Sequence, residues 1–272
     1  MIINDKFAGL TKNENGDYVY DGDLESNETI EIKLNDRFVI KGSIKSLKSI
    51  IVTRGITAGD GIESGWGITA GGGIEAGYSI TAGESITAGG GITAGEGIKA
   101  GCGIEAGWGI TAGDGIEAGW YITAGEGIKA GFGIEAGWGI TAGDGIEAGW
   151  YITAGEGIEA GWGITAGCGI TAGYGITAGG RIEADESIEA GCGIEAGEDI
   201  TSGESITAGS GIRAGCTVSA KTYIDCGERI FAGIKVLCAG ENCQKDITCA
   251  ELRQGEICYG NLILRDEDKN ND

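Results

Sequence analysis

Histidine and proline are both absent from this chain of 272 residues. Without histidine, most general acid–base schemes built on imidazole are excluded. The serines have no triad partner, and no glycine-rich phosphate loop lies between a strand and a helix. We therefore expect no enzyme, and we predict no catalytic residue, no cofactor and no metal site. Collagen is excluded as well, because the 57 glycines do not recur at every third position beside proline.

Basic residues are scarce in the middle of the chain. Residues 55–216 hold 22 acids against Lys99, Lys129, Arg181 and Arg213, so they supply −18 of the formal net charge of −22. The segments on either side contain nearly equal numbers of acidic and basic residues. This acidity argues against direct binding to nucleic acid or to anionic membranes, and it favours basic partners, metal ions or simple solubility.

Long apolar runs are missing too. No apolar stretch approaches about 18 residues, and the opening MIINDKFAGL lacks the pattern of a signal peptide. Nine cysteines, an odd number in a chain of this length, fit reduced thiols better than a disulfide framework. We expect a cytoplasmic protein, in the host cytoplasm if a phage encodes it.

What the chain does contain is a six-residue period. Every sixth residue from Ile56 to Val236 is Ile or Val, in units such as ITAGDG and IEAGWG. Ile and Ala stand two apart with Thr or Glu between them, which predicts a short strand whose Ile and Ala point inward. The Gly-x-Gly that follows predicts a bend, since glycine tolerates unusual backbone angles. Position x ranges from Gly90 to Trp108, so we expect it to face solvent. The fold class predicted is an all-β parallel β-helix, or β-solenoid.

The charges favour three hexads, or eighteen residues, for each coil. Stacked strands bring outward residues of successive coils together, where opposite charges attract and like charges repel. At a spacing of eighteen, the pairs are Lys99 with Glu117, Lys129 with Glu147, and Arg213 with Glu195. That spacing stacks one pair of glutamates, Glu117 on Glu135, whereas a twelve-residue coil would stack five. One observation favours a twelve-residue coil, because that spacing would align Trp138, Trp150, Trp162 and Tyr174 in one column. We predict the three-sided coil and leave its handedness open.

Three segments follow along the chain. Residues 1–37 are predicted to form an N-terminal cap, because they contain the hairpin-like NENGDYVYDGD and the alternating IEIKL. Residues 38–241 form the solenoid, since Phe38 and Ile44 keep the period in degraded form. Residues 242–272 form a C-terminal cap with NLIL and an acidic tail. Caps cover an open core and a strand edge, and an oligomer would form through them.

The aliphatic residue at the start of every hexad resembles the hexapeptide-repeat left-handed β-helix family, which also builds three-sided coils of eighteen residues. That family places small residues directly after the aliphatic one and four places further on, where this chain has Thr or Glu and the variable x. A right-handed triangular helix of the bactofilin type is the alternative. Acyltransferases of the hexapeptide family rely on a catalytic histidine, which this chain lacks. In shape and charge alone, the chain is also similar to pentapeptide-repeat proteins, some of which mimic DNA.

Two groups of outward residues are the candidate contacts for a partner. The acids are Glu105, Asp114, Glu117, Glu126, Glu135, Asp144, Glu147, Glu156 and Glu159. The aromatics are Trp108, Trp120, Trp138, Trp150 and Trp162. Each of these tryptophans occupies x after an IEA unit, where it either packs over the glycine corners of neighbouring coils or contacts a partner. Cysteines at x face solvent, whereas Cys226 and Cys238 take the inward place of Ala and are expected in the core.

The first functional hypothesis is an acidic interaction protein that binds a basic protein surface by imitating nucleic acid. Its repeat has one net negative charge per ~2.4 Å, against ~1.7 Å for duplex DNA. Anti-restriction, anti-CRISPR and gyrase-directed proteins are the natural users of such mimicry, and a phage origin would fit. The alternative is a structural, self-assembling solenoid of the bactofilin type. A weaker alternative, ice or surface binding, rests on outward Thr residues, although Glu and Lys interrupt every Thr column.

Overall fold

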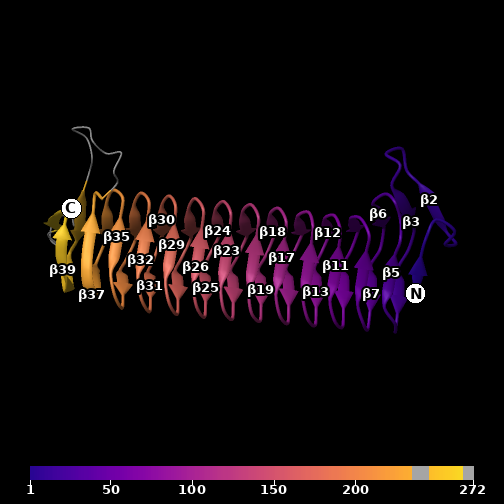
Figure 1. Ribbon diagram of the computed structural model, residues 1–272, viewed down its shortest axis with the longest axis horizontal. Helices are drawn as coiled ribbons and strands as arrows, with labels where there is room; N and C mark the ends of the chain where they lie inside the picture. The colour runs from indigo at the N-terminus through magenta and orange to yellow at the C-terminus, as the bar shows by residue number, and fades with distance from the viewer. Residues whose placement is uncertain (235–244, 266–272) are drawn as a thin grey trace, which may run out of the picture. The chain divides into compact units, whose positions relative to one another are not determined.

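The computed structural model describes residues 1–234 and 245–265 (Figure 1). Val236, Cys238, Cys243 and the acidic tail from residue 266 lie outside the described residues. The chain divides into two compact units, Met1–Gly137 and Trp138–Asp272. All elements of the described part are β-strands, and none of its residues forms a helix able to span a membrane.

The first unit contains three columns of parallel strands, and each strand of the repeat is hydrogen-bonded to the strand eighteen residues later. Column A comprises β4 (Leu24–Ser26), β7 (Ile44–Ser46), β10 (Ile62–Ser64), β13 (Ile80–Ala82), β16 (Ile98–Ala100), β19 (Ile116–Ala118) and β22 (Ile134–Ala136). Column B comprises β1 (Ile2–Ile3), β5 (Ile30–Ile32), β8 (Ile50–Val52), β11 (Ile68–Ala70), β14 (Ile86–Ala88), β17 (Ile104–Ala106) and β20 (Ile122–Ala124). Column C comprises β3 (Tyr18–Tyr20), β6 (Phe38–Ile40), β9 (Ile56–Ala58), β12 (Ile74–Ala76), β15 (Ile92–Ala94), β18 (Ile110–Ala112) and β21 (Ile128–Ala130).

The second unit repeats this arrangement in three columns of its own. Column D comprises β23 (Ile140–Ala142), β26 (Ile158–Ala160), β29 (Ile176–Ala178), β32 (Ile194–Ala196) and β35 (Ile212–Ala214). Column E comprises β24 (Ile146–Ala148), β27 (Ile164–Ala166), β30 (Ile182–Ala184), β33 (Ile200–Ser202) and β36 (Val218–Ala220). Column F comprises β25 (Ile152–Ala154), β28 (Ile170–Ala172), β31 (Ile188–Ala190) and β34 (Ile206–Ala208). In both units, then, three strands make one turn of the chain, and the predicted β-solenoid with eighteen-residue coils is confirmed.

The core of each unit is built from the inward positions of the hexad. Ile98 lies beside Ile80 and Ile116, and the alanines two residues on stack in the same register. The repeat isoleucines are at most 1% exposed and its alanines at most 5%. Stacked β-branched side chains suit a pleated surface and remove apolar area from water on every rung. Cys226 takes the place of Ala as expected, and it is completely buried.

The glycine that follows each Ala is required by the closeness of the coils. At Gly95, a Cβ would lie 2.0 Å from the carbonyl oxygen of Gly77, and the same collision recurs along the repeat. Among the described residues, the glycines with positive φ are Gly9, Gly16, Gly22, Gly233, Gly255 and Gly260, and of these only Gly233, in the last described hexad, lies within the run of hexads. The expectation that corner glycines supply unusual backbone angles is therefore wrong for the repeat. The second corner glycine is more permissive: a Cβ at Gly97 would lie 3.4 Å from an oxygen, and in the hexad 116–121 this second position is occupied by Tyr121.

Parallel pairing already begins inside residues 1–37. Tyr18, Leu24 and Ile30 pair with Phe38, Ile44 and Ile50, so this coil is twenty residues long. Ahead of it, β2 (Leu10–Lys12) pairs antiparallel with β3 and forms the hairpin that the sequence indicated. The hairpin places an antiparallel strand at the β3 end of column C.

The second unit ends in longer strands. Strand β37 (Tyr223–Ala232) pairs with both β34 and β35, so it continues columns F and D without a break. Strand β38 (Asp246–Cys249) continues column E, and β40 (Asn261–Leu264) pairs with β38. Strand β39 (Glu251–Tyr259) pairs with β37 through an irregular register. The NLIL segment is thus a strand of the last described coil.

Candidate functional site

All nine predicted acids are exposed, but they are spread around each unit. In the first unit, Glu117 and Glu135 lie on column A, Glu105 on column B, Asp114 at the C-to-A corner and Glu126 at the B-to-C corner. In the second unit, Glu159 lies on column D, Glu147 on column E, Asp144 at the D-to-E corner and Glu156 at the F-to-D corner. This dispersal follows from the hexad, because a step of six residues moves a side chain to the next column. The structure therefore places the acids on several sides of each unit and assembles no single acidic face among them.

Along a column, threonines separate many of the glutamates. Glu159 pairs in register with Thr141 and Thr177, and Glu75 with Thr57 and Thr93. The Thr57 hydroxyl lies 3.4 Å from a carboxylate oxygen of Glu75. A neutral outward residue increases the distance between like charges, which lowers their repulsion while leaving the acids in water. Glu117 and Glu135 are the pair in direct register that the sequence predicted.

Some of the negative charge is matched across rungs. Lys99 contacts Glu117, and Arg213 is in register with Glu195, as the eighteen-residue spacing predicted. Lys45 makes a further pair with Glu63, at 2.8 Å. Lys129 and Glu147 belong to different units, so their predicted pairing stays a prediction. Exposed pairs of this kind are screened by solvent and add little stability each.

Each x residue is fixed by the backbone of its corner. In the D-to-E corner, the Trp162 amide donates to Asp144 O at 3.1 Å, and the Trp162 carbonyl accepts from Gly180 N at 2.5 Å. In the B-to-C corner, Trp108 donates to Gly90 O at 3.3 Å. Corner residues therefore form backbone ladders of their own, with one x residue per rung.

The five predicted tryptophans are all substantially exposed, from 49% for Trp120 to 73% for Trp162. Tyr121 covers a glycine corner, because its ring occupies the space beside Gly103 where a Cβ would lie. Tyr121 was not among the predicted residues, although it lies eighteen positions after Gly103. Four of these five residues are more than half exposed to solvent.

The cysteines do not assemble into a site in the described part. Cys226 and Cys249 are fully buried, and burial raises the pKa of both thiols. The Cys226 thiol donates to Ser210 O at 2.9 Å. Within residues 1–234 and 245–265, no group of three or more cysteine, aspartate or glutamate side chains is placed to hold a metal ion.

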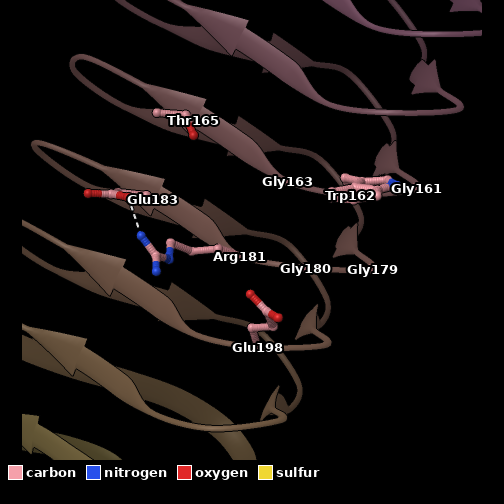
Figure 2. Close-up of a pocket in the computed structure, with 9 residues that line it drawn as sticks. All are labelled: Gly161, Trp162, Gly163, Thr165, Gly179, Gly180, Arg181, Glu183 and Glu198. Atoms are coloured by element: carbon pink, nitrogen blue, oxygen red, sulfur yellow. Dashed lines mark hydrogen bonds and ion pairs between the residues drawn. The ribbon is translucent and has the colours of Figure 1, made fainter.

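A hollow in the surface of the second unit was not predicted from the sequence. The Gly180 notch has a volume of about 440 Å³ and lies at the D-to-E corner (Figure 2). Its lining consists of Gly161, Trp162, Gly163, Thr165, Gly179, Gly180, Arg181, Glu183 and Glu198. The notch exists because Gly180 supplies no side chain at x, whereas Trp162 and Glu198 do so one coil before and one coil after.

Arg181 forms one wall of the notch. It stands where most hexads have the second corner glycine, and it is the one basic residue at that position within residues 55–216. Its Nη1 atom lies 3.4 Å from Glu183 Oε2, and its Nη2 atom lies 3.9 Å from Asp199 Oδ2. Figure 2 shows the guanidinium turned toward Glu183, with the Glu198 carboxylate pointing up from the next coil. The Gly180 notch is thus a polar recess with an aromatic residue at its edge, and its lining residues come from three successive coils.

Comparison with protein-family models, with curated proteins and with solved structures found no match to this chain.

Proposed function

We propose that this chain is a non-enzymatic interaction protein whose acidic surface binds a basic protein, and that the partner is a nucleic-acid-binding protein whose basic surface the chain occupies. The observation that carries the proposal is the exposure of the acids on several sides of both units. The repeat carries −18 over residues 55–216, which is two net negative charges for each eighteen-residue coil. With ~4.8 Å between rungs, that density is comparable to that of a duplex phosphate backbone, though lower.

A rigid scaffold makes such a surface effective. The Ile and Ala ladders fix the positions of the outward residues, so the charges need little rearrangement when a partner binds. A field from many fixed charges also speeds encounter with a basic surface. Inhibition of an anti-phage defence protein or of a DNA-acting enzyme, within the cytoplasm, is the biological role that this chemistry fits.

The test is capture from a bacterial lysate at low ionic strength, followed by elution with duplex DNA. Retained proteins that bind nucleic acid and are released by DNA would support the proposal. The matched control is the triple variant Glu135→Lys, Glu147→Lys and Glu159→Lys, whose substituted side chains are exposed and should leave the fold intact. Retention of the same proteins by this variant, or their failure to elute with DNA, would refute it.

Self-assembly is the second candidate, and a specific observation favours it. Leu262, Ile263 and Leu264 on β40 are 40%, 45% and 58% exposed, and Tyr259 on β39 is 46% exposed. Among the described strands, β40 pairs on one side with β38, which leaves its other edge able to accept a strand. Sedimentation over a range of concentrations tests this function. Assembly that Ile263→Lys abolishes would support it, and a monomer at all concentrations would exclude it.

A further inference from the structure

We propose that the Gly180 notch binds an arginine side chain presented by a protein partner. The inference rests on the proposed function insofar as the partner is basic, and it adds a defined anchor point to a surface that otherwise acts through distributed charge. Aromatic anchor points supply much of the affinity at protein interfaces.

The notch lies where one side chain is missing from the corner ladder. Gly180 N donates to Trp162 O, and Glu198 N donates to Gly180 O at 3.1 Å, so the three residues occupy consecutive rungs. Trp162 and Glu198 are therefore about 10 Å apart along the stack, with the Gly180 backbone as the floor between them. That interval admits one flat group whose face lies on the indole and whose edge points toward the carboxylate.

The charge of the lining selects a cation. Arg181 is the one base of the notch, and it lies beside Glu183 and Asp199. Glu198 adds a third carboxylate, so the immediate surroundings carry a net negative charge. A carboxylate has about four acceptor sites, so Glu198 accepts from an incoming donor in addition to its existing contacts.

The aromatic wall selects arginine over lysine. Trp162 is the most exposed of the tryptophans, at 73%, so its indole has surface to offer a ligand. A guanidinium stacks flat on an indole and at the same time donates two parallel hydrogen bonds to a carboxylate. A lysine ammonium is a strongly hydrated point charge that has no such planar fork. Stacking on Trp162 and bidentate pairing with Glu198 together make an arginine site.

The experiment compares two short peptides of equal charge, one with a central arginine and the other with a central lysine. Each is titrated into the full chain at low ionic strength, and the indole N–H signals of the tryptophans are followed by NMR. The variant Gly180→Leu fills the notch without changing charge. A Cβ at this position would lie 3.1 Å from Trp162 O, and other rungs already hold side chains here, so the variant should fold. Ser210→Leu, at the F-to-D corner of the same unit, is the matched control.

The expected result is that the arginine peptide binds about fivefold more tightly than the lysine peptide and shifts the Trp162 signal. Gly180→Leu should remove this preference, and Ser210→Leu should keep it. Equal affinity for both peptides in the native chain would overturn the notch proposal but leave the acidic-surface proposal intact. A preference that survives Gly180→Leu would overturn it equally. Binding of neither peptide would contradict both proposals.

Discussion

The Lys99 Nζ atom lies 2.8 Å from each of the two carboxylate oxygens of Glu117, the residue eighteen positions further along the chain. The contact joins the outward faces of β16 and β19, whose backbones pair Ile98 with Ile116. This surface ion pair is therefore direct evidence that one coil contains eighteen residues.

We expect the double reversal Lys99→Glu with Glu117→Lys to recover the stability lost by Lys99→Glu alone. The single reversal places a new carboxylate against Glu117, which itself stacks on Glu135, and should cost about 0.5 kcal/mol of unfolding free energy at low salt. Urea denaturation of the four members of the cycle measures the coupling. Additive effects in this cycle would mean that the two side chains do not interact across the rung.

The two glycines of one corner should respond differently to substitution. Gly95→Ala drives a methyl group to 2.0 Å from a backbone oxygen of the preceding coil, and we expect a loss of about 1–3 kcal/mol. Gly97→Ala, two residues away, meets its nearest backbone oxygen at 3.4 Å and should be nearly neutral. Thermal unfolding of both variants measures the difference. Equal losses at both positions would show that coil spacing is not what requires the first glycine.

The isoleucine ladder should be the main source of stability. Ile104 is completely buried between Ile86 and Ile122, so Ile104→Ala should cost about 2–5 kcal/mol. Thr87→Ala, on an outward position of the neighbouring strand, is the control and should change stability by less than about 0.5 kcal/mol. Hydrogen exchange should show the loss of protection concentrated in β14, β17 and β20, because coupling in a solenoid is local. Uniform loss of protection in every strand would contradict this picture.

The thiols should react in an order set by burial. Cys258 is exposed, whereas Cys226 and Cys249 are buried with pKa values raised above that of a free thiol. A raised pKa lowers the thiolate fraction at neutral pH, and burial blocks access, so both effects slow alkylation. Timed alkylation followed by peptide mass analysis should label Cys258 first and the other two only after denaturation. Early labelling of Cys226 would place it outside the core.

Most of the fold could be predicted from the sequence, because a strict period fixes inward and outward positions before any tertiary contact is known. The coil length also followed, because Lys99 and Glu117 must meet at one spacing and not at the other. The reason for the first corner glycine could not be found in the same way. It depends on the distance between coils, which brings Gly95 against Gly77 and which no local pattern reports.

The candidate site was predicted less completely. Exposure of the acids follows from strand alternation, and their dispersal over several sides follows from the hexad itself. The notch required two facts together: a coil of eighteen residues, and a corner residue without a side chain. Once the coil length is known, Trp162, Gly180 and Glu198 are placed at the same corner of three successive coils. The position of the notch could therefore have been predicted from their spacing of eighteen residues. The direction of the Arg181 side chain, by contrast, is set by Glu183 and Asp199 and needed the structure.

The most direct test of the central claim is the salt dependence of binding to a DNA-displaceable partner captured from lysate. The account predicts that affinity falls steeply with ionic strength, because exposed charges are screened within about 8 Å at physiological salt. It also predicts that single charge reversals matter little, since no one charge dominates a distributed field. Binding that persists unchanged in molar salt, resists competition by duplex DNA and is lost when Trp138 and Trp150 are replaced would contradict it.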